Sequence, residues 1–281
     1  IRPNSPLQKQ NGSGVLKGST SEEIAIDDSN FIDRTIKRKL IVSKSPMVEF
    51  TQDLSYLLRY PYGCIEQTTS QGFPLLYYRN VASDVLSSDD LEVKNANYIV
   101  NEVIKRIYLM QLYSGGFTYW PGEGTESYWG SVYATHFLFE ARRAGYNVDD
   151  AVLEKALDYL KQRANGKVII NYYYTRTEKR PIYSRANFYA LYVLSLAGQP
   201  QKSTMNFYLS KLQYMTADSK YLLSAAYVLS GDKSQSQNLI QNSFEADSKI
   251  RSTGGSFYSP IRDEAIALNA LLDADPTNDQ M

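Results

Sequence analysis

Helical hairpins repeat along this sequence from residue 46 almost to its end. Within each stretch apolar side chains recur every three or four residues, and glycine or proline separates many of the stretches. Some stretches, such as residues 186–194, are apolar on almost every side, whereas others have one polar face. The predicted helices span residues 46–60, 67–85, 91–113, 131–145, 152–163, 186–198, 204–215, 221–231, 233–244 and 262–274. This repetition predicts a mainly all-α fold with two layers of helices.

The first 45 residues have a different character. Residues 1–21 are rich in Pro, Gly, Ser, Asn and Gln, which is the composition of a linker. Ile24 and Ile26 then alternate with polar neighbours, and residues 36–42 have the composition of a β-strand. The sequence therefore predicts a linker and strands over residues 1–45, followed by a helical domain over residues 46–281.

Composition argues against several classes of function. The 281 residues carry 30 basic and 30 acidic side chains, so nothing favours nucleic acid or an anionic membrane as a partner. One cysteine excludes an intrachain disulfide framework and a cysteine-rich zinc site. No apolar run is long enough to cross a bilayer, and we expect no direct membrane contact. Because the sequence starts at Ile1 without a signal peptide, we expect it to be an excised part of a longer protein.

The single cysteine, Cys64, lies three residues before Gln67. Residues three apart on a helix share a face, so the Cys64 sulfur can reach the carbonyl carbon of the Gln67 side chain. If the two react and ammonia leaves, an internal thioester forms. Pro61 and Gly63 predict a tight turn that opens a helix, whose N-terminus would favour the thiolate form of Cys64. The pair alone is a weak signal, since an isolated cysteine is more often a small buried hydrophobe.

Longer stretches around this pair carry a resemblance to a known family. Residues 60–70, Tyr-Pro-Tyr-Gly-Cys-Ile-Glu-Gln-Thr-Thr-Ser, closely resemble the thioester motif of the bacterial alpha-2-macroglobulin family, the protease-trapping relatives of complement proteins. Residues 111–122, which include Gly-Gly-Phe-Thr-Tyr-Trp, are similar to a second segment of that family, as are residues 128–141. Shorter segments that are also similar to that family lie at residues 254–258 and 262–265.

The resemblance implies a fold and a function. The expected fold is an α/α toroid like that of terpenoid cyclases, preceded by a short β segment of a neighbouring CUB-like β-sandwich domain and truncated at its C-terminal end. The expected function is that of an endopeptidase inhibitor. A protease cuts a bait region elsewhere in the protein, and one of its lysine amines then attacks the thioester between Cys64 and Gln67. Such trapping is single-turnover, so we do not expect an enzyme.

The resemblance also implies partners and a location. The expected partners are target endopeptidases, bound covalently, and the other domains of the same protein; no cofactor or metal is implied. The expected location is the periplasm or cell envelope of a Gram-negative bacterium, with the full protein secreted or lipid-anchored.

Several other residues have expected places around the thioester. The resemblance implies that Tyr60 shields it from water, and Tyr62, Gly63 and Glu66 are candidates for shielding or supporting it. The only histidine, His136, does not fall where complement relatives carry the histidine that attacks their thioester, so we expect direct attack by amines.

Aromatic residues are expected to line the toroid. Trp120 is a candidate for that lining, together with His136. The chain has 24 tyrosines, densest in residues 171–175, and we interpret that cluster as lining the toroid and its edge.

Two enzymatic hypotheses remain open. Gly-Gly-Phe loops also occur in protein prenyltransferase β subunits and terpene cyclases, toroidal enzymes that need zinc ligands or an Asp-rich acid motif. The pairs at residues 89–90 and 149–150 are Asp-Asp, and we interpret them as helix caps or solvated charges. A cysteine hydrolase would instead pair Cys64 with His136.

Overall fold

A computed structural model of the chain describes residues 8, 10, 12, 14–21, 23–25, 27–32, 34–38, 40, 42, 61–82, 91–173, 177–240, 244–245, 247 and 259–277. The chain separates into two compact units, Ile1–Lys44 and Ser45–Met281. The helix expected over residues 46–60 lies outside the described residues. None of the helices in the described part of the chain is long and apolar enough to cross a membrane.

Turns and extended chain make up what is described of the first unit. One turn closes where the Thr20 N–H donates to the Lys17 carbonyl at 3.2 Å. None of the described residues of this unit lies in a β-strand, so the strand expected over residues 36–42 is not formed among them. Leu40 and Val42 are 73% and 77% exposed. An isolated strand cannot bury its apolar face, so a strand-like composition is not enough to form a strand.

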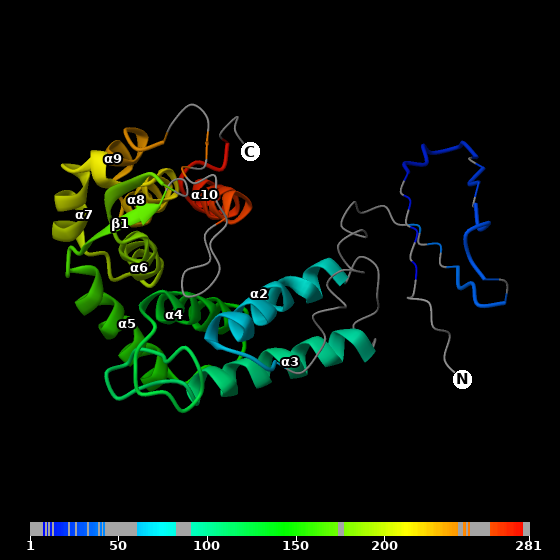
Figure 1. Cartoon of the computed structure of the whole chain (residues 1–281), viewed down its shortest axis with the longest axis horizontal. Helices are drawn as coiled ribbons and strands as arrows, with labels where there is room; N and C mark the ends of the chain where they lie inside the picture. Colours follow the sequence, from blue (N-terminus) through cyan, green and yellow to red (C-terminus); the bar gives the residue numbers. More distant parts are fainter. Residues whose placement is uncertain are drawn as a thin grey trace. The chain divides into compact units, whose positions relative to one another are not determined.

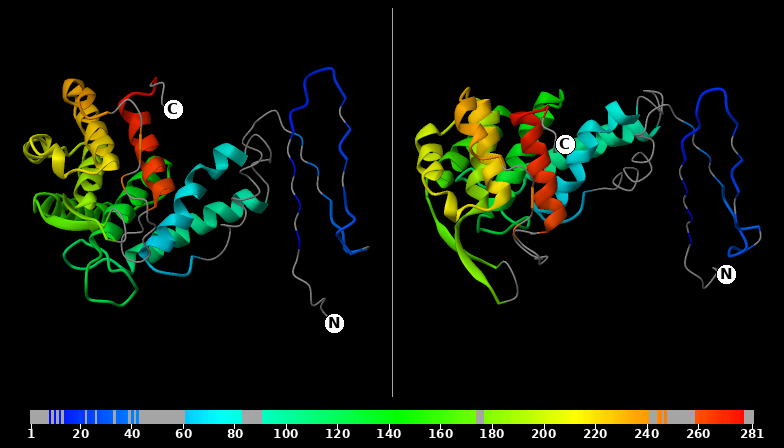
Figure 2. Two further views of the ribbon diagram at one scale, coloured as in Figure 1. Left: turned by 45° about the horizontal axis from the view of Figure 1, so that its top comes forward. Right: turned by 90° about the horizontal axis from the view of Figure 1, so that it is seen from above.

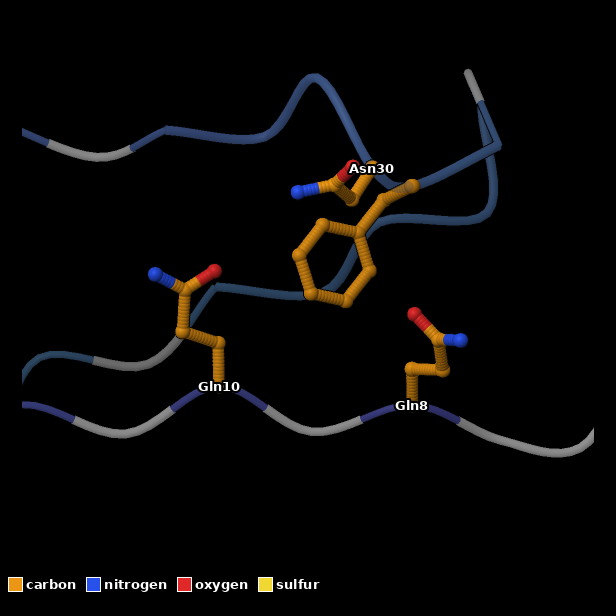
Figure 3. A pocket seen from close by; sticks show the side chains of 4 residues that line it. Gln8, Gln10 and Asn30 are labelled. Carbon is orange, nitrogen blue, oxygen red and sulfur yellow. The ribbon is translucent and has the colours of Figure 1, made fainter.

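The first unit also contains an open hollow of about 590 Å³, lined by Gln8, Gln10, Asn30 and Phe31. Figure 3 shows Gln8 and Gln10 on one stretch of chain, with Asn30 across from them on another. Neutral amides around an open hollow supply neither a charge nor a nucleophile, so it is not a candidate catalytic site.

Two layers of helices form the second unit (Figures 1 and 2). Its helices are α2 (Ile65–Ala82), α3 (Leu91–Tyr108), α4 (Tyr128–Arg143), α5 (Asp150–Ala164), α6 (Arg185–Leu196), α7 (Lys202–Leu209), α8 (Ala217–Leu229), α9 (Lys233–Gln237) and α10 (Pro260–Ala274), with a 3₁₀-helix η2 (Leu212–Tyr214). Helices α2, α4, α6, α8 and α10 contact one another in that order along the inner side of an arc, and α3, α5, α7 and α9 lie outside them. The described helices therefore form the predicted α/α toroid architecture.

Burial distinguishes the two layers. In the inner helix α6 every residue from Arg185 to Ser195 is buried. The outer helix α5 buries one face only, through residues such as Leu153, Ala156 and Leu160. The sequence pattern predicted this difference, because a helix that is apolar on every side must be surrounded by protein.

Three predicted helices end well before the expected residue. The helix predicted over residues 91–113 ends at Tyr108, where the chain enters a loop of close backbone contacts. The one predicted over 204–215 is divided into α7 and η2, since the Ser210 hydroxyl donates to the Phe207 carbonyl at 2.8 Å and closes α7. The one predicted over 233–244 ends at Gln237, in a run with few apolar side chains to hold it against α8.

A β-hairpin interrupts the helices where the sequence predicted none. Strand β1 (Ile169–Tyr173) pairs antiparallel with β2 (Lys179–Tyr183), and the ribbon projects from the helical layers in the right panel of Figure 2. Tyr172 and Ile182 are buried together, with Ile170 packed against them. Tyr172 and Tyr173 of the tyrosine-rich cluster therefore lie in a hairpin, whose β-branched and aromatic residues favour that structure. Sequence reasoning assigned neither a helix nor a strand to residues 164–185 and expected the cluster to line the toroid and its edge.

A buried arginine joins three inner helices to this hairpin. Arg185 of α6 donates from Nε and Nη2 to Asp218 Oδ2 of α8, at 3.0 and 2.5 Å, and from Nη2 to Asp263 of α10. Its Nη1 donates to the Tyr172 hydroxyl at 2.9 Å. Burial opposes the charge of Arg185, but Asp218 and Asp263 outweigh it and raise the pKa of the guanidinium. The inner layer is thus fixed by one ion-pair cluster as well as by apolar packing.

Candidate functional site

Helix α2 begins with a tight turn at Gly63 and Cys64. Gly63 has φ of +135°, a conformation that side chains on L residues rarely adopt. The Cys64 carbonyl accepts the Thr68 N–H at 2.9 Å, so Cys64 occupies the N-cap position of the helix. Cys64 is only 2% exposed. The sequence prediction of a turn that opens a helix at this cysteine is confirmed.

Gln67, three residues into the helix, folds back over that turn. Its side-chain oxygen Oε1 accepts a hydrogen bond from the Cys64 backbone N–H at 3.2 Å. This contact is one half of a capping box, in which the residue at position N3 reaches back to the N-cap N–H. A Cβ atom added at Gly63 would lie 2.3 Å from Gln67 Oε1 and 3.1 Å from its Cδ. The amide of Gln67 is therefore directed at the backbone that carries the thiol, and a helix cap brings Cys64 and Gln67 together rather than a shared helical face.

Neighbouring elements hold the turn in place. Arg106, in the last turn of α3, donates from Nη2 to the Gly63 carbonyl at 3.0 Å. The Tyr119 carbonyl, in the loop after α3, accepts the Ile65 N–H at 2.9 Å. Gly130 of α4 packs so closely that a Cβ there would lie 2.6 Å from Ile65 Cγ2. Sequence reasoning missed Arg106 and Gly130. The only signal for Arg106 is a basic residue at a helix end, which is a common placement with a simpler electrostatic cause.

The Gly-Gly-Phe loop packs partly as predicted. Gly115 has φ of +91°, and Phe117 is fully buried, with its N–H donating to Ser131 Oγ at 2.8 Å. Trp120 is 46% exposed and lies outside the cavity lining, and its expected place in the lining of the toroid stays a prediction. Its ring meets the Tyr119 ring edge-on, with centroids 5.8 Å apart. Phe117 fills the buried position in the loop, and the chain has reached the surface by Trp120.

The two tyrosines proposed as shields have different outcomes. Tyr60 lies outside the described residues. Tyr62 is 76% exposed, so most of its ring surface faces solvent while Cys64 beneath the turn is buried. The burial of Cys64 therefore does not depend on a buried Tyr62.

A cavity of about 330 Å³ opens on the inner side of the arc, between α2 and the later inner helices. Aromatic rings form much of its wall, and the polar groups in it include Glu66, His136 and Arg262. His136 Nδ1 lies 2.8 Å from the Tyr189 hydroxyl, and its ring meets that of Phe73 at 5.0 Å between centroids. Burial lowers the pKa of His136 to about 3, so the imidazole is neutral at physiological pH.

Glu66 lies between Cys64 and Gln67 in sequence but turns toward this cavity. Burial raises the pKa of Glu66 to about 7, against the opposing influence of Arg262. Its Oε2 atom is buried and has no hydrogen-bond partner among the described residues. A carboxyl in this state changes charge near neutral pH, in the helical turn that also carries Cys64 and Gln67.

The two enzymatic hypotheses gain no support from these positions. No hydrogen bond joins Cys64 to His136, although the structure describes both, so the thiol–imidazole pair of a cysteine hydrolase is not assembled. Asp149 accepts the Ala151 N–H at 2.8 Å as the N-cap of α5, which confirms its interpretation as a cap. The pair at residues 89–90 lies outside the described residues. Among the described residues no group of three His, Cys, Asp or Glu is placed to hold a metal ion.

The arrangement at the start of α2 suits acyl transfer. The carbonyl carbon of Gln67 is held beside Cys64 by the cap. Gln67 is exposed whereas Cys64 is buried. A nucleophile from solvent therefore has access to the glutamine side of the pair, and a displaced sulfur would stay inside the protein.

Known proteins are similar to this chain in sequence and in structure. Residues 35–178 match the family described as the A-macroglobulin TED domain. Alpha-2-macroglobulin of Escherichia coli strain K12 is 26% identical over 276 residues, which cover 96% of this chain and 17% of that protein. The crystal structure of Salmonella alpha-2-macroglobulin reacted with methylamine is similar with a TM-score of 0.62 and 25% identity, over 82% of this chain and 15% of that one.

A third similarity concerns the fold alone. The crystal structure of trypsin-activated alpha-2-macroglobulin from Escherichia coli has a TM-score of 0.63 and 23% identity, over 79% of this chain and 15% of that one. The chain thus spans less than a fifth of the length of each of these relatives. On the family match, which covers half of its sequence, the chain belongs to the A-macroglobulin TED domain family.

Proposed function

We propose that Cys64 and Gln67 join in an internal thioester, and that the chain is the reactive domain of a bacterial alpha-2-macroglobulin-like endopeptidase inhibitor. One observation carries the proposal: Gln67 Oε1 accepts the Cys64 N–H at 3.2 Å. The oxygen occupies the space that a Cβ atom at Gly63 would fill. An exposed glutamine would otherwise gain side-chain entropy by extending into water. Its folded-back position directs the amide at the backbone of Cys64.

The chemistry needs no cofactor. In forming the bond, the Cys64 thiolate attacks Gln67 Cδ, and the amide nitrogen takes up a proton and leaves as ammonia. In trapping, a lysine amine attacks the same carbon and the carbon–sulfur bond breaks. The amine gives up a proton, the sulfur takes one, and the products are an isopeptide bond and a free Cys64 thiol. Each domain reacts once, which makes the protein an inhibitor and not an enzyme.

The relatives support this assignment from their own behaviour. A Salmonella relative has been reacted with methylamine, and an Escherichia coli relative has been activated by trypsin. Methylamine is a small model of a lysine side chain, and trypsin is a protease. The bait region and the choice of target protease would lie in other domains of a longer protein. The periplasmic location and the lipid anchor stay predictions.

Labelling with an amine tests the proposed site. The chain is incubated with a biotin-tagged primary amine, and the labelled residue is located by peptide mapping. We expect one label per chain, on Gln67, together with one newly titratable thiol. Cys64→Ala should abolish labelling, because no activated acyl group can form. Gln71→Asn, one turn further along α2, serves as the matched control and should label normally. Label that persists in Cys64→Ala would refute the thioester.

A further inference from the structure

One peptide group at the start of α2 is held from both sides. The Gly63 carbonyl and the Cys64 N–H belong to the same planar peptide unit, and the bond is trans, so they point in opposite directions. Arg106 Nη2 donates to the Gly63 oxygen at 3.0 Å. On the other side, the Cys64 N–H donates to Gln67 Oε1 at 3.2 Å. The three groups therefore form one chain of hydrogen bonds that ends on the oxygen of the reacting carbonyl.

The acceptor in that chain is the atom on which charge develops. When an amine attacks Gln67 Cδ, the carbon–oxygen electron pair moves onto Oε1, and the oxyanion forms where the Cys64 N–H already points. The pair returns as the carbon–sulfur bond breaks and Cys64 leaves as a thiolate, which takes up the proton released by the amine. We propose that the Cys64 N–H is the oxyanion donor of this reaction, and that Arg106 is the positioning residue that aims it. This inference rests on the proposed thioester.

Gly63 and Arg106 have separate parts in this arrangement. Gly63 leaves the space that the oxygen occupies, because any Cβ there would overlap Gln67 Oε1 at 2.3 Å. Arg106 fixes the rotation of the peptide plane about its flanking bonds, since a glycine at φ +135° has little steric preference of its own. A charged donor on the carbonyl also polarises the peptide unit and makes its N–H a stronger donor.

The location of Arg106 fits a device that serves this turn. It stands in the last turn of α3, on an element separate from the pair it supports, and reaches across 43 residues of sequence. Its Nε–H is buried and has no hydrogen-bond partner among the described residues. The guanidinium thus lies against the carbonyl of Gly63, the residue that precedes the departing sulfur.

The test uses Arg106→Met, which keeps the length of the side chain but removes the donors, and Arg106→Lys, which restores a charged donor. Lys105→Met, on the preceding and exposed position of α3, is the matched control. We expect Arg106→Met to slow aminolysis of the preformed thioester by methylamine about tenfold to a hundredfold. Arg106→Lys should recover most of that loss, and Lys105→Met should react at the wild-type rate.

A spectroscopic signature separates this role from a purely structural one. With carbon-13 at the glutamine side-chain carbonyl, the thioester stretch is isolated as the difference between infrared spectra before and after methylamine. In the native wild-type chain it should lie below its position in the urea-unfolded chain, because the Cys64 N–H bonds to the oxygen. In Arg106→Met it should move upward. A merely structural Arg106 would lower the melting temperature and leave both the stretch and the reaction rate of folded molecules unchanged.

The outcomes distinguish the two proposals. A wild-type chain whose mass shows no loss of ammonia and whose Cys64 titrates freely would overturn the thioester itself. A wild-type thioester whose stretch matches that of the unfolded chain would overturn the oxyanion donor alone, even if every Arg106 variant failed to fold. A normal rate and an unshifted stretch in Arg106→Met would overturn the positioning role alone.

Discussion

The turn at the start of α2 and the cavity beside it differ in how their polar groups are held and in how far these groups are exposed to solvent. At the turn, backbone hydrogen bonds to Cys64 and Gln67 hold a thiol and an amide together, with Gln67 open to solvent. In the cavity, burial favours the neutral forms of His136 and Glu66 and surrounds them with aromatic rings. The difference teaches that backbone geometry at a helix cap, and not burial in the cavity, brings Cys64 and Gln67 together.

The largest effect is expected when the space at Gly63 is filled. Gly63→Ala should abolish thioester formation, because the new Cβ would overlap Gln67 Oε1 and push the amide away from the thiol. Intact mass and thiol titration measure the loss. Gly122→Ala is the matched control, since Gly122 also has positive φ, at +84°, but a Cβ there meets nothing within 4 Å. A Gly63→Ala chain that still forms the thioester would contradict the geometry of the cap.

Removing the buried arginine should damage the framework and spare the turn. Arg185→Met leaves Asp218 and Asp263 buried without their cation, and should lower the free energy of unfolding by about 3–5 kcal/mol. Urea unfolding measures this change. Arg180→Met, at an exposed ion pair with Glu178, should cost about 0–1 kcal/mol. Folded Arg185→Met molecules should still react with methylamine at the normal rate, and a lost reaction would mean that the two regions are coupled.

The charge of Glu66 gives a smaller, pH-dependent effect. Its pKa is raised from 4.5 to about 7 in the folded chain, so the folded state binds the proton more tightly and stability falls as pH rises through that window. Because Glu66 is only partly buried and solvent screens its charge, we expect Glu66→Gln to raise the free energy of unfolding by about 1 kcal/mol near pH 8 and by almost nothing near pH 4. Glu154→Gln, at an exposed position of α5, is the control. A gain that is equal at both pH values would contradict the raised pKa.

The smallest effect is expected at His136. The His136 ring is hydrogen-bonded to the Tyr189 hydroxyl within the cavity. His136→Gln should therefore change the rate of methylamine attack on the thioester by less than about twofold. The ratio of amide to ester product, measured by mass spectrometry in a mixture of methylamine and glycerol, should also stay constant. A fall in ester formation would instead indicate a histidine-assisted reaction and make the cavity part of the reactive centre.

Sequence reasoning reached the helical layers and the turn at Cys64 because both are local patterns. Apolar periodicity is enough to predict an inner helix such as α6, and the residues around Cys64 are enough for the resemblance. Arg106 and Gly130 were missed, because their importance arises from packing against a turn more than forty residues earlier. The hairpin of β1 and β2 was missed because the strands pair only with each other, over five residues each. Periodicity also has no bearing on a loop residue such as Trp120, whose place in the lining of the toroid stays a prediction.

Intact mass is the most direct test of the proposed thioester between Cys64 and Gln67. It is measured on freshly prepared chain before and after methylamine, with thiol titration of the same samples. For the untreated chain we predict a mass lower than that of the sequence by one ammonia, and no titratable thiol. Methylamine should then add one equivalent of itself and release the Cys64 thiol. A mass equal to that of the sequence, with Cys64 free from the start both here and in the longer protein, would contradict it.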